Sequence, residues 1–189
     1  MKTKEASKYL FFWNEAKPKG KRTDKSCLNQ WYKASFSISV HAFGELHELT
    51  FTTAEHYMMY KKAELFKDYD IRNQIYKSQS PKEAQALGRE VKNYNDAKWQ
   101  AISFEVVVDA NMHKFAQHEK LKKYLLNTGD KVLVEASPID CIWGIGLDKD
   151  DPKAQDPNTW RGENKLGFAL MEVRKRLKEE GYYEENYTF

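Results

Sequence analysis

The sequence lacks long apolar runs and has few cysteines. No stretch approaches the roughly 20 consecutive apolar residues that a membrane-spanning helix needs. The segment from Met1 to Glu5 contains no apolar stretch of the kind found in a secretory signal. The two cysteines, Cys27 and Cys141, lack CxxC spacing. We therefore expect a cytoplasmic protein with two free thiols and no membrane partner.

Familiar cofactor and nucleophile motifs are also absent. The five histidines form neither an HExxH pair nor a CxxC…HxxxH set, so we expect no metal ion and no other cofactor. Neither a P-loop nor a GxSxG elbow occurs in the chain.

The excess of charge is small as well. The 31 Lys and Arg residues exceed the 28 Asp and Glu residues by a net charge of +3. This excess is compatible with a phosphorylated ligand but does not demand one. Without a clustered basic helix, it gives only thin support to the hypothesis of a nucleic-acid-binding domain.

The sequence does contain enough apolar material for a packed core. Hydrophobic residues make up 41% of the 189 positions and aromatic residues 14%, which excludes disorder across the whole chain. We find no internal repeat and no linker. We therefore expect residues 1–189 to form a single domain that ends in a loosely held tail at residues 181–189.

Local patterns predict an α+β fold that is rich in helices and has a small β-sheet. The apolar run at residues 104–108 is also compatible with a strand, but we prefer a helix there. Residues 17–25 and 148–159 have the composition of polar surface loops. Strands are expected at residues 9–13, 36–41, 48–52 and 132–136, and helices at residues 53–66, 81–91, 99–118, 121–127 and from Asn164 onward.

The helix expected after the N-cap Thr53 has an unusual face. At about 100° per residue, Glu55 and Lys62 fall nearly in line in the middle of its apolar side. Burying either charge alone would cost several kcal/mol. The two groups are therefore either a structural ion pair or ionisable groups at the floor of a pocket. We expect the opposite side to face water; it holds His56, Tyr57, Tyr60, Lys61 and Glu64.

A second candidate site follows the strand expected at residues 132–136. Asp140 precedes a turn that contains Gly144 and Gly146; it is either a functional carboxylate at a strand end or a local cap. The two glycines would let the backbone approach a phosphate or another ligand. Asn164, at a helix start, is either a ligand-binding amide or an N-cap. Five tryptophans are candidates for the core or for stacking on a base or sugar.

Six motifs follow one another along the chain: Glu55-His-Tyr-Met-Met-Tyr-Lys-Lys62-Ala, Lys114-Phe115, Leu126-Asn-Thr128-Gly129, Glu135-Ala-Ser137, Asp140-Cys-Ile-Trp143-Gly-Ile-Gly146 and Trp160-Arg-Gly162-Glu-Asn164-Lys-Leu166-Gly167. Together they resemble the YbiA-like proteins, also called the NADAR domain family, over roughly residues 28–177. The loops at residues 17–25 and 148–159 and the tail depart from the family pattern, and could border the pocket.

The resemblance implies a glycosyl hydrolase that cleaves an N-glycosidic bond to ribose. Substrates in the family include phosphoribosylated pyrimidine intermediates of riboflavin synthesis, and guanine bases that carry ADP-ribose. We therefore expect a nucleotide-like small molecule, or ADP-ribosylated nucleic acid, as substrate. Carried over by position, the functional residues are Glu55, Lys62, Trp99, Asp140, Trp143 and Asn164.

This resemblance suggests a role for each candidate. Glu55 or Asp140 would stabilise the positive charge that builds on the ribose and activate water. Lys62 would either attack C1′ as a neutral amine or bind phosphate or ribose oxygens as a cation. Substrate-binding residues are expected to be Asn29, Trp31, Trp99, Trp143, Gly144, Gly146 and Asn164.

The main rival hypothesis is a non-catalytic module that binds ADP-ribose or nucleotides in the same aromatic pocket. Neither the leaving base nor the oligomeric state follows from the sequence.

Overall fold

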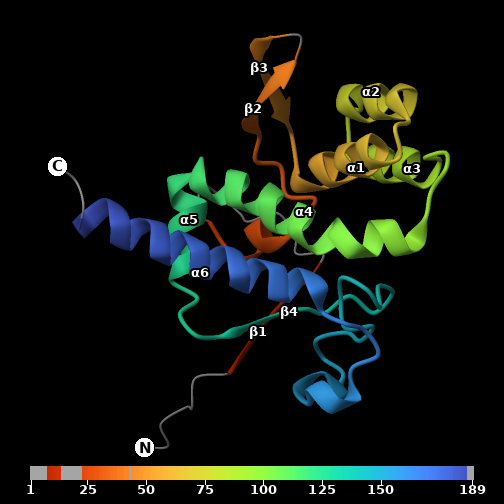
Figure 1. The fold of residues 1–189 in the computed structure, drawn as a ribbon. Helices are drawn as coiled ribbons and strands as arrows, with labels where there is room; N and C mark the ends of the chain where they lie inside the picture. The colour runs from red at the N-terminus through yellow and green to blue at the C-terminus, as the bar shows by residue number, and fades with distance from the viewer. Residues whose placement is uncertain (1–7, 14–22, 43, 187–189) are drawn as a thin grey trace, which may run out of the picture. The chain divides into compact units, whose positions relative to one another are not determined.

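Figure 1 shows the computed structural model of the chain, which describes residues 8–13, 23–42 and 44–186. These residues contain six α-helices, four β-strands and three short 3₁₀ helices. This composition confirms the predicted α+β class, although the strands form two separate pairs rather than one sheet.

The chain divides into two compact units. One spans residues 30–119, and the other combines the described residues up to 29 with those from 120 onward. A single domain over residues 1–189 stays a prediction. None of the described helices combines the length and the apolar character that crossing a bilayer would require.

The unit of residues 30–119 begins with the predicted hairpin. β2 (Phe36–Ala42) pairs antiparallel with β3 (Glu45–Phe51), and Phe36 lies opposite Phe51. In the turn, Gly44 adopts φ +82°, a conformation that L side chains rarely take. Phe36 and Phe51 are both buried, with ring centroids 6.1 Å apart. This end of the hairpin therefore packs into the core and leads directly into the next helix.

That helix, α1 (Ala54–Leu65), is the centre of the unit. Thr53 caps it as predicted, because the Thr53 hydroxyl accepts the N–H of His56 at 3.3 Å. Around α1 pack three further helices, which are grouped with it in Figure 1: α2 (Tyr69–Lys77), α3 (Pro81–Arg89) and α4 (Asp96–Ala116).

Neighbours on several sides leave α1 without a fully water-facing side. The prediction of such a side is wrong for His56, Tyr57 and Tyr60, none of which is more than 7% exposed. Lys61 and Glu64, on the same side of the helix, are partly exposed. Tertiary packing thus overrides the amphipathic pattern over the first two turns of the helix.

The helices around α1 are capped locally. The sequence analysis missed α2, whose N-cap Asp68 accepts the N–H of Ile71 at 3.3 Å. α3 begins as predicted at Ser80, whose hydroxyl accepts the N–H of Glu83 at 3.2 Å. α4 runs without interruption through residues 104–108, which confirms the helix preferred for that segment.

The other unit is built on a parallel strand pair. β1 (Tyr9–Phe12) pairs with β4 (Val132–Glu135), and α6 (Lys165–Asn186) packs against β4. α5 (Glu119–Leu126) precedes β4, and the 3₁₀ helices η1 (Lys25–Leu28), η2 (Pro152–Gln155) and η3 (Pro157–Thr159) complete the described elements. The predicted helical spacing after Asn164 is confirmed, since four residues are at most 1% exposed: Leu166, Leu170, Val173 and Leu177.

The predicted tail is wrong for residues 181–186, which continue α6. Residues 187–189 lie outside the described residues. The segment at residues 148–159 is largely exposed as expected, but η2 and η3 give it regular structure.

Candidate functional site

Glu55 lies in the first turn of α1. The residue is only 6% exposed, and its backbone N–H binds the carbonyl oxygen of Gln30 at 3.2 Å. The N-terminal end of a helix carries a partial positive charge that favours an anion. The fold therefore holds this carboxylate in a nearly dry position at the helix end where a negative charge is best tolerated.

Lys62 lies two turns further along the same face of α1 and is half-buried. Its Nζ donates to the carbonyl oxygen of Gly88 at 2.7 Å and lies 4.4 Å from the ring centroid of Tyr94. Burial lowers the pKa of Lys62, and the positive charge of Arg89 lowers it further, whereas the charge of Glu55 raises it. The charge of Glu55 thus acts on the Lys62 amine, and the protonated form of this amine is less favoured than in water.

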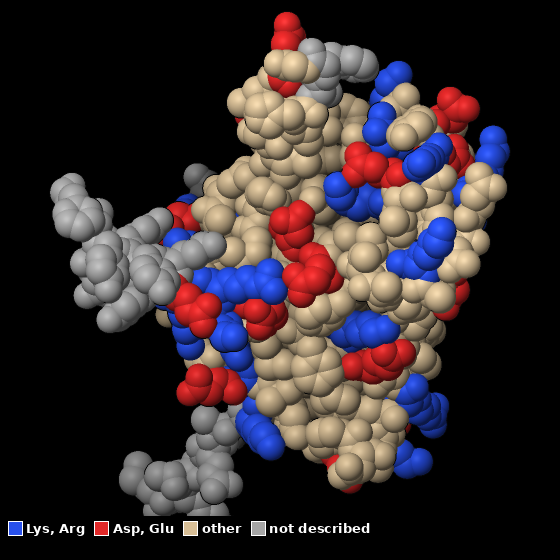
Figure 2. All heavy atoms as spheres, viewed as in Figure 1, with Lys and Arg blue, Asp and Glu red and all other residues tan. Residues whose placement is uncertain are grey.

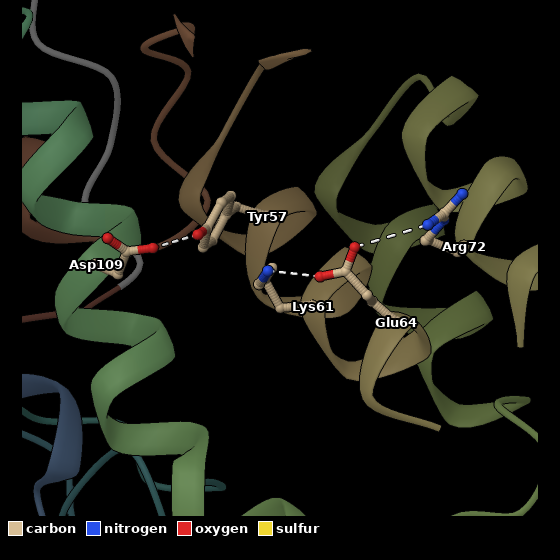
Figure 3. A network of polar contacts seen from close by, with 5 residues as sticks. All are labelled: Tyr57, Lys61, Glu64, Arg72 and Asp109. Carbon is tan, nitrogen blue, oxygen red and sulfur yellow. Dashed lines mark hydrogen bonds and ion pairs between the residues drawn. The ribbon is translucent and has the colours of Figure 1, made fainter. Parts of the chain in front are cut away.

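A separate polar network fixes another side of α1 (Figure 3). The phenol of Tyr57 donates to the carboxylate of Asp109 on α4, and burial raises the Tyr57 pKa. Lys61 Nζ donates to Glu64 at 2.5 Å, and Glu64 lies 3.6 Å from Arg72 on α2. The Tyr57–Asp109 and Glu64–Arg72 contacts therefore join α1 to α4 and α2 on sides of α1 away from Glu55 and Lys62.

The two predicted tryptophans of this unit have different surroundings. Trp99, in the first turn of α4, is buried, with 6% of the residue exposed. Trp31 is 42% exposed and lines a cavity of about 460 Å³ beside the start of α1. Of these two tryptophans, Trp31 therefore presents the larger ring surface for stacking.

Two buried amides were missed by the sequence analysis. Asn111 Nδ2 donates to Gln30 Oε1 at 2.7 Å and to the carbonyl oxygen of Val107 at 2.8 Å. The pair thereby anchors the residue whose carbonyl receives the N–H of Glu55. Gln30 Nε2 and Asn111 Oδ1 have no hydrogen-bond partner among the described residues. An asparagine inside the apolar run of α4 was the available signal, because an amide there must be paired or used.

Lys114 was also missed as a site candidate, although it belongs to one of the family motifs. It is fully buried on α4, with Nζ 5.0 Å from the ring centroid of Phe115 and 5.7 Å from that of Tyr32. Aromatic faces partly compensate a buried ammonium group. Lys62 was selected because it is a charged residue on the apolar side of a helix. The same reasoning applies to Lys114, because α4 is apolar on nearly every side.

The remaining predicted residues lie in the unit that contains β4. Asp140 Oδ1 accepts the N–H groups of Ile142 and Trp143, both at 2.8 Å. This is the arrangement of a local cap, the structural alternative considered for Asp140. The carboxylate therefore shapes the loop that carries Trp143, which is partly exposed.

Gly144 and Gly146 face protein atoms rather than open space. A Cβ on Gly144 would lie 2.9 Å from the carbonyl oxygen of Glu135, and one on Gly146 would lie 2.9 Å from Cys141 Sγ. Both glycines are buried, and Gly146 has φ +66°. The structure thus gives a packing reason for both glycines, because the loop leaves no space for a side chain. The expectation that they give a ligand access to the backbone stays a prediction.

Asn164 is fully buried and bridges the edge of β4 that lies away from β1. Its Oδ1 accepts the N–H of Glu135 at 2.9 Å, and its Nδ2 donates to the carbonyl oxygen of Leu133 at 3.0 Å. The amide thus makes the pair of hydrogen bonds that a neighbouring strand would make with this edge of β4. These bonds give Asn164 a structural role, and the ligand contact expected from the sequence stays a prediction.

Two further predicted features belong to the segment before residue 30. Asn29 ends η1, where its backbone N–H binds the carbonyl of Ser26 at 3.1 Å, and the residue is partly exposed. Of the basic loop at residues 17–25, positions 17–22 lie outside the described residues.

Surface charge, metal-binding groups and cysteines were also considered in the described residues. On the face seen in Figure 2, basic and acidic side chains are interspersed rather than gathered into one basic field. The described residues contain no group of three His, Cys, Asp or Glu side chains that could hold a metal ion. Cys27 and Cys141 are free thiols, as expected.

Comparison with known proteins gives consistent matches. Residues 11–178 match the model of the NADAR domain family. A protein of Acanthamoeba polyphaga mimivirus that is named as an N-glycosidase is 36% identical over 173 residues, which is 90% of this chain and 97% of the viral protein. Protein irg-1 of Caenorhabditis elegans is 44% identical over 131 residues, which is 68% of this chain and 62% of that protein.

YbiA of Escherichia coli, also named as an N-glycosidase, is 33% identical over 128 residues, which is 68% of this chain and 71% of YbiA. The solution structure of YbiA matches the fold with a TM-score of 0.66 and 25% identity, covering 97% of this chain and 92% of that one.

Proposed function

This chain belongs to the NADAR domain family, and from that premise we propose that it is an N-glycosidase that hydrolyses the bond between a ribose and a base. Relatives from a virus and from a bacterium that are named as N-glycosidases support the proposal. The structural observation that carries it is one face of α1, where a buried carboxylate and a half-buried amine share a surface. Ionisable groups that are withdrawn from water and share one surface are typical of active sites.

Glu55 is the catalytic carboxylate in this proposal. Cleavage of a C1′–N bond leaves positive charge on the ribose ring, which a nearby carboxylate stabilises. The same group can orient a water molecule and accept its proton as the water attacks C1′. Glu55 is preferred to Asp140 for this role, because Oδ1 of Asp140 already binds two backbone N–H groups of its own loop.

Two roles are considered for Lys62, that of a nucleophile and that of a binding cation. As a nucleophile, its neutral nitrogen would displace the base at C1′ and lose a proton, and the sugar ring would open to an imine that water then hydrolyses. As a cation, it would bind phosphate or ribose oxygens. The Tyr94 ring and the Gly88 carbonyl both favour a positively charged nitrogen, so we assign Lys62 the cationic role.

The substrate proposed is a nucleotide-like ribosyl compound. Two members of this class follow from the family resemblance: guanine that carries ADP-ribose, and the phosphoribosylated pyrimidine intermediates of riboflavin synthesis. Both present a ribose C1′ bonded to nitrogen and at least one phosphate, which suits a carboxylate and an amine on one surface.

The test is hydrolysis of both substrate types by the wild type and by matched variants of α1. We expect Glu55→Gln to lower kcat by about 100- to 10,000-fold, the usual contribution of general acid–base catalysis. Glu64→Gln is the matched control, because Glu64 lies on the same helix but pairs with Lys61 and Arg72. Equal rates for the two variants would remove Glu55 from the mechanism.

The role of Lys62 is tested separately. We expect Lys62→Ala to raise KM more than it lowers kcat, while Lys61→Ala changes neither. Borohydride added during turnover should trap no adduct; a covalent product on Lys62 would establish the nucleophilic role instead. Tight binding of ADP-ribose with no product from either substrate would favour the rival hypothesis of a non-catalytic binding module.

A further inference from the structure

The cavity beside Trp31 is not explained by the proposed chemistry. It measures about 460 Å³ and is formed entirely within the unit of residues 30–119. Its walls come from three segments: residues 31–33, the end of β3 with the N-cap of α1, and residues 76–81 between α2 and α3. Its volume falls within the range of small-molecule sites.

This cavity lies on a different side of α1 from the proposed catalytic pair. Thr53 and the buried His56 mark the cavity side: Thr53 lines the cavity, and its hydroxyl lies 2.7 Å from His56 Nδ1. At about 100° per residue, Glu55 and Lys62 point roughly 100 to 180° away from these two positions. Lys62 is also about 13 Å further along the axis than Thr53, at 1.5 Å per residue.

The lining of the cavity combines aromatic rings with cations. Trp31 and Tyr76 are 42% and 39% exposed. Lys33 and Lys77 are both exposed at the same cavity, and none of the described residues that line it is acidic. Exposed aromatic rings beside lysines provide a stacking surface next to an anion-binding surface.

Polar groups complete the lining without adding negative charge. The hydroxyl of Thr52 can donate to an anion, whereas the hydroxyl of Ser78 already donates its one hydrogen to the carbonyl of Ile75 at 2.7 Å. The nearby His56 contributes no fixed positive charge, because burial lowers its pKa. Glu83, whose charge acts on His56, binds the backbone N–H of Gln79 at 2.9 Å. The positive charge of the cavity therefore comes from its two lysines.

We propose that this cavity binds one nucleotide of a single-stranded nucleic acid, with the base stacked on Trp31 and the phosphate held by Lys33 and Lys77. The proposal extends the proposed function and rests on it in one respect: the strand would be an ADP-ribosylated substrate, and the bound nucleotide would lie near the modified base. A stacking ring with two cations and no acidic lining residue suits a nucleotide better than an acidic peptide, which offers no base to stack.

Binding is tested first, by the fluorescence anisotropy of a short labelled oligothymidylate added to the full chain. We expect Trp31→Leu to weaken the affinity by roughly 5- to 150-fold, the effect of losing one stacked base. Trp31→Phe should recover part of the affinity, and both variants should keep the thermal unfolding midpoint of the wild type. Equal affinity of wild type and Trp31→Leu would overturn the proposal.

The phosphate contacts are tested by salt dependence. A plot of log affinity against log salt concentration has a negative slope. The double variant Lys33→Gln/Lys77→Gln should make this slope less steep by about 1.4, or 0.7 for each lost phosphate contact. Lys67→Gln/Lys92→Gln is the matched control, since it removes the same charge beside a different cavity of the same unit. An equal change of slope in both double variants would overturn the assigned contacts. Polyglutamate should not compete with the oligonucleotide; effective competition would indicate a peptide site.

Turnover separates this proposal from the proposed function. The variant Lys33→Gln/Lys77→Gln should raise KM for an ADP-ribosylated oligonucleotide and leave kcat/KM on ADP-ribosylated guanosine unchanged. A loss on both substrates would place the two lysines in the hydrolytic site and overturn a separate one. Absence of turnover in the wild type, with the Trp31 and lysine effects on binding intact, would refute only the proposed hydrolysis.

Discussion

Replacing Asn164 by alanine should severely destabilise the protein, because this one amide binds two backbone groups of β4. β1 occupies the other edge, where the N–H groups of Val132 and Ala136 reach the carbonyls of Lys8 and Phe12, both at 3.0 Å. On the edge away from β1, the Ile145 N–H binds the Glu135 carbonyl at 2.9 Å, and Asn164 binds both the Leu133 carbonyl and the Glu135 N–H.

The magnitude follows from three contributions. Leaving a buried backbone donor and a buried acceptor without partners costs about 1–3 kcal/mol each. Asn164 has φ +54°, and a left-handed conformation costs an alanine about 1 kcal/mol more. The expected loss in free energy of unfolding is therefore about 3–7 kcal/mol, a large fraction of the stability of a typical domain.

Two further variants separate these contributions. Asn164→Gly should recover about 1 kcal/mol relative to Asn164→Ala, because glycine accepts positive φ without strain. Asn164→Asp keeps the acceptor for the Glu135 N–H but places a carboxylate against the Leu133 carbonyl, so it should still destabilise. Urea unfolding monitored by circular dichroism measures all three. A change below about 1 kcal/mol in Asn164→Ala, accompanied by a raised KM, would refute the structural role and restore the ligand role expected from the sequence.

Two other predictions concern a close contact and a buried histidine. Gly167→Ala should lower the free energy of unfolding several times more than Gly129→Ala does. A Cβ at position 167 would clash with the Leu133 carbonyl oxygen. A Cβ at position 129 would meet no atom within 4 Å, so that variant strains only a backbone with φ +60°. Equal losses in urea unfolding would contradict this. Burial lowers the pKa of His56 below 6.5, so on acidification the unfolded chain takes up a proton before the folded chain does. Stability should therefore fall more steeply from roughly pH 7.5 to 5.5 in the wild type than in His56→Gln; parallel urea unfolding curves would contradict the assignment.

Elements defined by short-range signals were predictable from the sequence. Thr53 and Ser80 mark the starts of α1 and α3, because a side-chain oxygen caps N–H groups only three residues away. The apolar spacing after Asn164 likewise gives α6 and its buried face. By contrast, α2 carries only two buried apolar residues, Ile71 and Ile75, and this pattern is too short to stand out.

Features that depend on distant contacts were not predictable. The parallel pairing of β1 with β4 joins residues that are 123 positions apart in the sequence, such as Tyr9 and Val132. His56, Tyr57 and Tyr60 would face water on an isolated amphipathic helix, but they are buried because other elements pack on that side too.

The candidate site shows the same division. Helical periodicity was sufficient to place Glu55 and Lys62 on one face of α1, because it depends only on positions within that helix. It could not distinguish ligand-binding from structural roles at Asp140 and Asn164, whose hydrogen bonds follow from a folded loop and a strand edge. The resemblance to a family therefore supplied the expected function, and the structure adds the hydrogen bonds that give Asp140 and Asn164 structural roles.

The most direct measurement is the rate of ribose–base cleavage in a single turnover, compared between Glu55→Gln and Glu64→Gln at saturating enzyme. Each change removes one negative charge from α1 while keeping the shape of the side chain. We predict a rate for Glu55→Gln at least about 100-fold below that of Glu64→Gln, with both variants folded. A rate for Glu55→Gln within a few-fold of the control would show that the buried carboxylate does not take part in breaking the bond.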